Sequence, residues 1–375
     1  MVFGIVHKRL AKFVCIAVGA ILLLADSLIG QEPVALERVR VGESGKGFVV
    51  GEAGKPFPVR GFNFDRYHDG RLLEDFWIEE WSLVEQAFRD MKKLGANATR
   101  IHLQVGAFMS APDQVKPEAL ERLEKLIALA EAEKIYLNLT GLGCYHKQDV
   151  PAWYDALPEN ERWEVQANFW RAVAEAGKNS GAIFCYDLMN EPVVAAGQKP
   201  QKDWLGPGFA GKHYVQFINK SLEGRGRVDV AKAWIEKLVN AIREKDEQGL
   251  ITLGLVDWSL DRPGLSSGFI PSQVAERLDF ICVHIYPETG KSDEALEVLQ
   301  AFAAVGKPVV IEEIFPMRCS SEELVAFLDR SEAHSSGIFT FFWGQTATGL
   351  KEEKSMAAAI TAEGLDRISS YWSTR

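Results

Sequence analysis

Apolar runs of strand length alternate with amphipathic segments of helical length along most of the chain. Strands are expected at residues 59–64, 98–103, 135–139, 182–188, 250–256, 280–286, 308–311 and 337–343. Helices are expected at 75–94, from Pro117 onward, and at 158–178, 228–245, 295–304, 322–333 and 354–368. In the clearest of them, Val230, Trp234 and Leu238 fall on one face, as in a helix that packs against a core.

This alternation predicts a parallel sheet with helices packed outside it. The sheet is either open and doubly wound or closed, and a count of eight strands favours the (β/α)8 TIM barrel. The first strand is not followed by a Gly-x-Gly-x-x-Gly turn, which argues against a dinucleotide-binding fold. A short N-terminal β-hairpin with a Gly-rich turn is expected at 39–56. A long loop, rich in Gly, Pro and aromatic residues, is expected after strand 4, at 192–227.

The N-terminus has the pattern of an export signal. A basic start containing His7-Lys8-Arg9 and Lys12 precedes an apolar run at 13–25, which is short for a membrane span. Small residues at 25–27 offer one cleavage site and Gly30/Gln31 another, so residues 1–30 are predicted as a signal peptide. The alternative is an uncleaved anchor helix. We expect a secreted or periplasmic protein without stable membrane insertion after cleavage.

Composition narrows the classes of partner. The 375-residue chain has a formal net charge of -10 and no block of Lys and Arg, so nucleic acid is not an expected partner. The sequence contains no Cys-x-x-Cys pair and no His-x-x-x-His spacing, so neither a metal nor another cofactor is expected. Cys185 and Cys282 fall in predicted strands and are expected as buried free thiols. No linker divides the chain after the signal, which predicts one domain at 31–375 and a monomer.

Polar residues collect at the carboxyl ends of the predicted strands, where barrel enzymes hold their active sites. They are Asn63 and Asp65, Arg100 and His102, Asn190 and Glu191, His284 and Tyr286, Glu313, and Trp343. Hydrolysis of a glycosidic bond needs two carboxyl groups, one to protonate the leaving oxygen and one to attack the anomeric carbon. An arginine and a tyrosine keep the attacking carboxylate ionised and oriented, and an aromatic face stacks on a sugar ring.

Six motifs in this order resemble glycoside hydrolase family 5, the cellulase-like retaining barrels. They are Gly61-Phe62-Asn63, Thr99-Arg100-Ile101, Asn190-Glu191-Pro192, His284-Ile285-Tyr286, Glu313 after Lys307-Pro308-Val309-Val310, and Trp343. The resemblance runs from the hairpin near Val39 to the last strand. It implies a retaining glycosidase that cleaves β-glycosidic bonds of a poly- or oligosaccharide, of β-glucan or β-mannan type. The implied reaction is a double displacement through a covalent glycosyl-enzyme intermediate.

The resemblance also implies the roles of individual residues. Glu191 is the general acid/base and Glu313 the nucleophile, with Asn190 holding the sugar 2-hydroxyl. The supporting residues are Asn63, Arg100 and Tyr286 with His284 nearby, and Trp343 as the floor of the subsite. Glu312 is the rival nucleophile. Strand alternation turns only one of two adjacent residues toward the barrel axis, and the family pattern places Glu313 there.

Alternatives stay open at several points. A catalytically inactive carbohydrate-binding barrel, a glycosidase acting on glycolipid or short glycosides, and a metal-dependent hydrolase would use the same fold. The family often has a histidine at the end of strand three, where this chain has Leu139-Thr140-Gly141, with His146 later.

Single residues also have two interpretations. Arg100 could form a structural ion pair with Asp187, and Asp257 and Trp258 are candidates for substrate contact. Trp204, Phe209 and Tyr214 either pin the long loop or line sugar subsites. The loop itself either closes one end of the cleft, which favours attack at chain ends, or extends it for internal attack.

Overall fold

The computed structural model describes residues 36–197, 199–262 and 265–375, so the signal expected at 1–30 lies outside the described residues. Eight parallel strands form a closed barrel in the order β12-β13-β14-β15-β4-β5-β8-β9, which confirms the predicted TIM barrel. The strands are β4 (Val59–Phe64), β5 (Ala98–Gln104), β8 (Tyr136–Gly143), β9 (Ile183–Asn190), β12 (Leu250–Val256), β13 (Ile281–His284), β14 (Val309–Ile314) and β15 (Gly337–Thr340).

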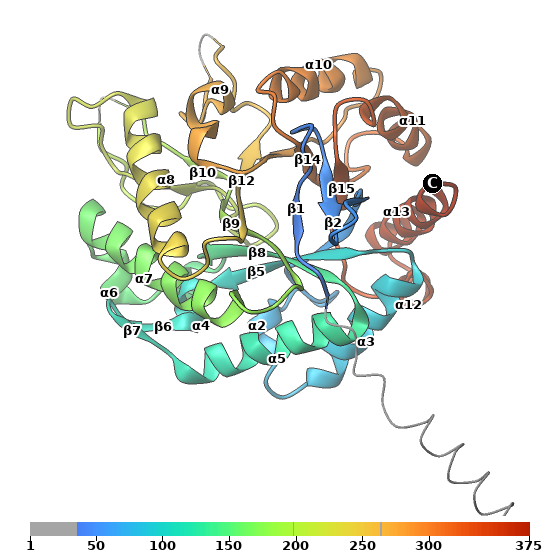
Figure 1. Cartoon of the computed structure of the whole chain (residues 1–375), viewed down its shortest axis with the longest axis horizontal. Coiled ribbons are helices and arrows are strands. Elements are labelled where there is room, and N and C mark those ends of the chain that lie inside the picture. The colour runs from blue at the N-terminus through green and yellow to red at the C-terminus, as the bar shows by residue number, and fades with distance from the viewer. Residues whose placement is uncertain (1–35, 198, 263–264) are drawn as a thin grey trace, which may run out of the picture. The chain divides into compact units, whose positions relative to one another are not determined.

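Helices surround the barrel (Figure 1). The long ones are α3 (Trp81–Lys93), α5 (Pro117–Glu133), α7 (Glu159–Gly177), α8 (Arg227–Arg243), α10 (Ser292–Ala303), α11 (Ser321–Ser331) and α13 (Met356–Ser373). The short ones are α2 (Leu73–Phe76), α4 (Val105–Phe108), α6 (Ala152–Asp155), α9 (Pro271–Val274) and α12 (Ala347–Glu352), with 3-10 turns at Lys147–Asp149 and Ala275–Arg277. Among these helices, all in the described ranges, none is long and apolar enough to cross a membrane.

One predicted helix is divided in two. The segment expected at 75–94 consists of α2 and α3 with a turn between them. The Asp75 carboxylate accepts a hydrogen bond of 2.8 Å from the Leu72 backbone N–H, which caps α2 and satisfies one of its free donors. The amphipathic pattern that predicted the helix belongs to α3, where Val84, Phe88 and Met91 are buried.

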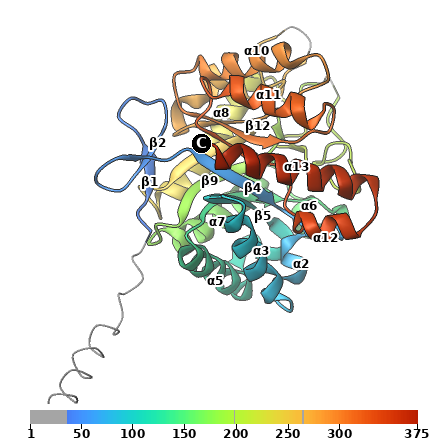
Figure 2. The ribbon, with the colours of Figure 1, turned by 90° about the vertical axis from the view of Figure 1, so that its right-hand side faces the viewer.

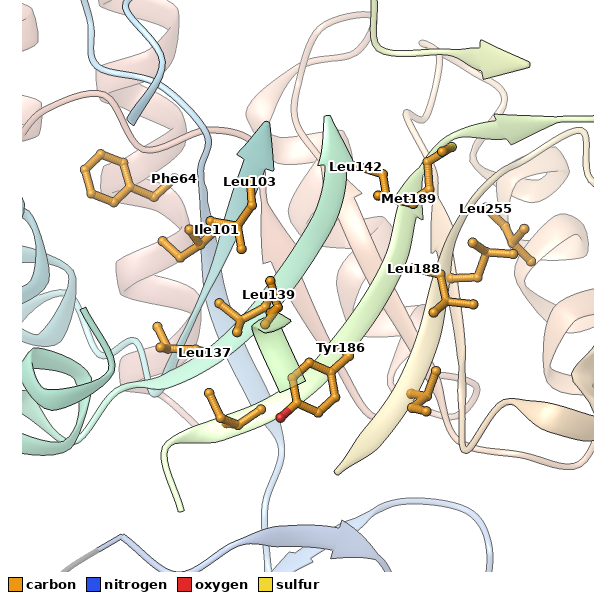
Figure 3. Packing of buried hydrophobic residues seen from close by; sticks show 14 of the residues in the cluster. Phe64, Ile101, Leu103, Leu137, Leu139, Leu142, Tyr186, Leu188, Met189 and Leu255 are labelled. Carbon is orange, nitrogen blue, oxygen red and sulfur yellow. The ribbon is translucent and has the colours of Figure 1, made fainter. Parts of the chain in front are cut away.

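Apolar side chains on the outer faces of the strands pack against the helices and form the main core. Figure 3 shows part of this layer, with Ile101, Leu137, Leu139 and Leu188 along three neighbouring strands. Each of these four side chains is fully or almost fully buried. A core of this kind holds the strand ends at fixed positions, which is a requirement for an active site built from several strands.

The N-terminal hairpin closes the end of the barrel where the strands begin (Figure 2). It consists of β1 (Val39–Val41), β2 (Phe48–Val50) and β3 (Lys55–Pro56), paired antiparallel. The Phe48 ring lies 5.1 Å from the ring of Phe184 and 5.0 Å from that of Phe280, both edge-on. Cys185 and Cys282 are free thiols in this apolar layer, as expected. The hairpin therefore covers this end of the barrel with apolar side chains.

Two short strand pairs lie at the other end of the barrel, where the barrel strands finish. They are β6 (Met109–Ala111) with β7 (Gln114–Val115), and β10 (Pro192–Val193) with β11 (Gln216–Phe217). The second pair joins the start of the long loop expected at 192–227 to residues 216–217 within it.

Candidate active site

Arg100 lies at the centre of the polar cluster and is fully buried. Its Nη1 donates to Glu313 Oε1 at 2.8 Å and to Asn63 Oδ1 at 3.0 Å. Its Nη2 donates to Asp187 Oδ2 at 2.8 Å and to Asn190 Oδ1 at 3.0 Å. Burial alone would lower the pKa of this guanidinium, but the surrounding carboxylates hold it well above its ordinary value. The two interpretations of Arg100 therefore both hold, because it pairs with Asp187 and with Glu313 at once.

Glu312 and Glu313 both face the barrel interior, so the expectation that only one of them would do so was wrong. Regular alternation applies up to Glu312, since Ile311 packs in the outer core. The pairing of β14 with β15 then shifts register between Ile311 and Ile314, and Ile314 again packs outward. Such an irregularity adds one residue to the inner side and re-aims its side chain. It brings Glu313 into the mouth of the barrel directly above Glu312.

Glu313 is held by two hydrogen-bond donors and has one imidazole nearby. Besides Arg100, the Tyr286 hydroxyl donates to Glu313 Oε2 at 2.6 Å, and His284 Nδ1 lies 3.5 Å from the same oxygen. Burial, reinforced by the Glu313 charge, raises the pKa of Tyr286 well above its ordinary value, so the phenol stays protonated and donates. Donors on both carboxylate oxygens fix the orientation of Glu313.

Glu191 follows the last residue of β9 in a left-handed backbone conformation, with φ of 46°. This conformation costs a non-glycine residue roughly 1–2 kcal/mol. It is held by a hydrogen bond of 3.0 Å from the Glu191 N–H to the Gly254 carbonyl and by one of 3.3 Å from Gln216 N–H to the Glu191 carbonyl. Backbone strain at a pocket residue is typical of functional sites. Here it turns the Glu191 carboxylate into the mouth of the barrel, where the side chain is 16% exposed.

His284 connects the three glutamates. Its Nδ1 lies 3.0 Å from Glu191 Oε1, and its Nε2 lies 3.4 Å from Glu312 Oε2. Burial lowers the pKa of the imidazole, but Glu313, Glu191 and Glu312 together raise it to about 10. The ring is therefore an imidazolium at neutral pH, and its positive charge lies among the carboxyl groups of the three glutamates.

Glu312 occupies a deeper position. It is fully buried, accepts a hydrogen bond of 2.6 Å from Asn138 Nδ2, and its Oε1 lies 3.4 Å from Arg100 Nε. Although burial opposes ionisation, the charges of Arg100 and His284 lower the pKa of Glu312. Gly254 makes room for this layer, since a Cβ there would lie 2.9–3.1 Å from atoms of Arg100, Glu312 and His284. Sequence reasoning did not identify the role of this glycine.

The spacing of Glu191, His284 and Glu313 is also that of a metal site, because one donor atom from each lies within 4.8 Å of the others. His284 Nδ1, however, already lies 3.0 Å from Glu191 Oε1, so these two groups pair with each other. Tyr286 and Arg100 already donate to the two oxygens of Glu313. The chemistry of this donor set suits two carboxyl groups that exchange protons and attack a carbon better than it suits a cation.

Glu191, Glu313 and Tyr286 line a cavity of about 170 Å³. Its remaining walls are apolar or aromatic and come mainly from the long loop, as Pro207, Phe209, Tyr214 and Val215, with Met317 and Phe341 on the other sides. Tyr214 and Phe209 thus line the cavity, whereas Trp204 is buried and stacks with Arg162, with 4.6 Å between the guanidinium carbon and the ring centre. Asp257 and Trp258 line a larger adjoining cleft of about 600 Å³, which shares Tyr286 and Met317 with the cavity.

Trp343 does not line this cavity, so its expected place as the subsite floor needs correction. It is 1% exposed and packs edge-on against Phe62 at 5.4 Å between ring centres. Its backbone N–H donates to the Asn63 carbonyl at 2.7 Å, which leaves the indole in the outer core. Phe341 takes the position against Glu191 and Glu313 instead.

We therefore expect Trp343→Ala to act on stability. Loss of a buried tryptophan side chain costs about 3–5 kcal/mol of the free energy of unfolding, which urea denaturation would measure. Phe341→Ala is the matched comparison, and it should change substrate affinity more than the tryptophan variant does. A Trp343→Ala protein of unchanged stability but raised KM would restore the tryptophan as a substrate platform.

The remaining predicted residues lie around Arg100. Asn63 is fully buried, donates to the Glu312 carbonyl at 2.9 Å and supports Arg100 from the far side. Asn190 is 1% exposed, and its Nδ2 donates to the Tyr214 carbonyl at 3.2 Å. His102 contacts the Tyr145 hydroxyl, and burial lowers its pKa well below the ordinary value, so it stays neutral.

Comparison with known proteins shows the family to which this chain belongs. The family model described as Cellulase (glycosyl hydrolase family 5) matches residues 50–363. No curated protein matches the sequence.

Among solved structures, the chain is similar to the endo-1,4-β-mannanase from Rhizomucor miehei, at 18% identity and a TM-score of 0.61, over 90% of this chain and 100% of that one. It is similar to the β-1,4-mannanase from the sea hare Aplysia kurodai, at 18% identity and 0.63, over 88% and 96%. The exo-β-1,4-mannosidase Op5Man5 from Opitutaceae bacterium strain TAV5 matches at 14% and 0.62, over 89% of this chain but only 62% of that one. At these identities the likeness is one of fold.

Proposed function

Because the chain belongs to glycosyl hydrolase family 5, a family of O-glycosyl hydrolases, we propose that it cleaves β-glycosidic bonds with retention of configuration. The observation that carries this proposal is the separation of two carboxyl groups. One oxygen of Glu191 and one of Glu313 lie within 4.8 Å of each other. Retaining enzymes hold the pair at about 5–5.5 Å, whereas inverting enzymes leave about 6.5–9.5 Å for a water molecule.

In the first step of the proposed reaction, Glu313 attacks the anomeric carbon and the bond to the leaving oxygen breaks. Arg100 and Tyr286 hold the attacking carboxylate in one orientation through hydrogen bonds of 2.8 and 2.6 Å. Glu191 gives its proton to the leaving oxygen. The product of this step is a sugar joined by an ester bond to Glu313.

In the second step, Glu191 takes a proton from water, and the resulting hydroxide attacks the same carbon and releases Glu313. The contact of 3.0 Å between His284 Nδ1 and Glu191 fixes the position of the carboxyl group that changes roles. Two inversions at one carbon give net retention.

The proposed substrate is a β-linked poly- or oligosaccharide of mannan or glucan type. Mannan is the first choice for assay, because the similar structures named above are two mannanases and a mannosidase. We also propose export through residues 1–30, on the basic and apolar pattern of that segment alone.

The first test is the stereochemistry of the product. The protein is expected to hydrolyse an aryl β-mannoside or aryl β-glucoside, and proton NMR within the first minutes should show the β-anomer of the released sugar before mutarotation. First appearance of the α-anomer would rule out the retaining mechanism. Absence of hydrolysis on aryl glycosides and on soluble mannan and glucan alike would favour a binding barrel.

A further inference from the structure

The mouth of the barrel is closed on one side and open on the other. On the strands β4, β5 and β8, residues at the carboxyl ends such as Asn63, His102 and Thr140 are buried. A cavity of about 300 Å³ beside Gln104 and Tyr145 shares no lining residue with the catalytic cavity. On the strands β12 to β14, the same region opens into the 600 Å³ cleft lined by Asp257, Trp258 and Tyr286. A glycan chain that reaches the catalytic carboxyl groups therefore has room to extend in one direction.

The long loop after β9 makes the closed side. It carries Tyr214 over the mouth, where the ring lies 5.2 Å from the ring of Tyr145 and 6.3 Å from that of Phe341. The backbone of the loop is fastened at both sides of this point, by His213 N–H to the Tyr145 carbonyl at 2.8 Å and by Asn190 Nδ2 to the Tyr214 carbonyl. Tyr214 is thus part of a built wall rather than a free side chain.

Arg66 completes the wall from the segment after β4. Its guanidinium donates to the Tyr214 hydroxyl and lies 4.2 Å from the ring centre of Phe342 and 4.9 Å from that of Phe341. A salt bridge of 3.7 Å to the fully buried Asp65 holds it from below the aromatic rings. Burial lowers the pKa of Arg66, but the charge of Asp65 and the hydrogen bond to Tyr214 outweigh this effect and raise the pKa above its ordinary value. The wall is therefore cationic.

The direction of the open side identifies which part of the substrate is blocked. Glu191, the proposed proton donor to the leaving oxygen, is bonded through its backbone to Gly254 of β12. A leaving part that extends over β12 and β13, on the side of this contact, finds room in the open cleft. The sugar attacked by Glu313 lies against Tyr214 and Phe341. A further sugar on its non-reducing side would have to occupy the space that Tyr214 and Arg66 fill.

The size of the cavity agrees with a single ring on that side. At about 170 Å³ it is smaller than the roughly 300–1,000 Å³ of pockets that take drug-sized ligands. We infer that the enzyme attacks its glycan from the non-reducing end and releases one sugar at a time, because Tyr214 and Phe341, which Arg66 contacts, end the cavity after one ring. This inference rests on the proposed glycosidase function and specifies its substrate as a chain end.

The experiment follows the products of a β-1,4-linked mannopentaose that carries a fluorescent label at its reducing end. The wild-type protein is expected to give free mannose and labelled tetramer first, then labelled trimer, in sequence. Soluble mannan should lose viscosity slowly relative to the sugar released. Early labelled dimer and trimer together with a fast drop in viscosity would overturn the inference and leave the glycosidase function standing. If the protein hydrolyses neither the pentaose nor aryl glycosides, the proposed glycosidase function itself fails.

Variants of the wall test its role separately. Tyr214→Ala should raise the ratio of internal to terminal cleavage severalfold, because it removes the ring between Tyr145 and Phe341. Tyr214→Phe is the matched control, since it keeps the ring and should keep terminal cleavage. If Tyr214→Ala does not fold, Arg66→Ala opens the same wall from the other side. An unchanged product ratio in a folded variant lacking either side chain would show that the wall does not set the site of attack.

Discussion

Glu313→Ala is expected to lower kcat/KM by more than about 10⁴-fold on every substrate, because removal of a nucleophile in a covalent mechanism has effects of about 10⁴–10⁶-fold. The loss should be as large for activated aryl glycosides as for oligosaccharides, since no leaving group compensates for a missing nucleophile. Steady-state rates on both substrate types would measure it. Added azide should restore turnover of the aryl glycoside and give the α-glycosyl azide, formed by one inversion.

Glu312 provides the sharpest control for this assignment. A 2-deoxy-2-fluoro glycoside with a good leaving group should trap the intermediate, and fragmentation of the labelled peptide should place the sugar on Glu313. Glu312 is fully buried and its oxygens face Asn138 and His284, so it has no path to an anomeric carbon in the cavity. A sugar found on Glu312 would reverse the assignment of the two residues.

The fold could be predicted because its signal is spread over the whole chain. Eight apolar runs separated by helical segments leave few arrangements, and parallel strands bring all their carboxyl ends to one edge. That rule alone placed Arg100, Glu191, His284, Tyr286 and Glu313 near each other. The contacts of 2.6–3.5 Å among these residues agree with it.

The details that could not be predicted depend on contacts between strands rather than on local pattern. The register shift that turns both Glu312 and Glu313 inward arises from the pairing of β14 with β15, and no period in the sequence marks it. The run at 337–343 is apolar almost throughout, so alternation gave no means of telling Phe341 from Trp343. The family motif suggested the tryptophan, but the backbone bond of Trp343 to Asn63 directs its ring into the core.

The long loop shows a third kind of limit. Composition identified Tyr214 as either a pin for the loop or a wall of the site. It contacts Tyr145, Arg66 and Phe341, which lie in segments after three different strands. Tyr214 therefore both pins the loop and forms a wall of the site. Only the closed barrel brings those segments together, and the site of attack along a glycan follows from that closure.

Glu191→Ala is expected to separate proton transfer from nucleophilic attack. Loss of a general acid costs about 10²–10⁴-fold, and we expect this reduction in kcat/KM for oligosaccharides, whose leaving oxygen needs a proton. For an aryl glycoside with an acidic phenol, the first step should stay fast and the second should become slow. The glycosyl-enzyme should then accumulate, visible as a burst of phenol and as an added sugar mass on the protein.

Azide distinguishes this variant from Glu313→Ala. It should enter the space left by Glu191 and attack the intermediate, which gives the β-glycosyl azide by two inversions and raises turnover. Glu288→Ala is the matched control, because this carboxylate lines the open cleft but bonds Lys291 and Arg318, at 2.8 and 3.0 Å, on the surface. It should leave the dependence on leaving group unchanged. An α-azide from Glu191→Ala would mean that Glu191, held by its strained backbone beside His284, is the attacking group and Glu313 the acid.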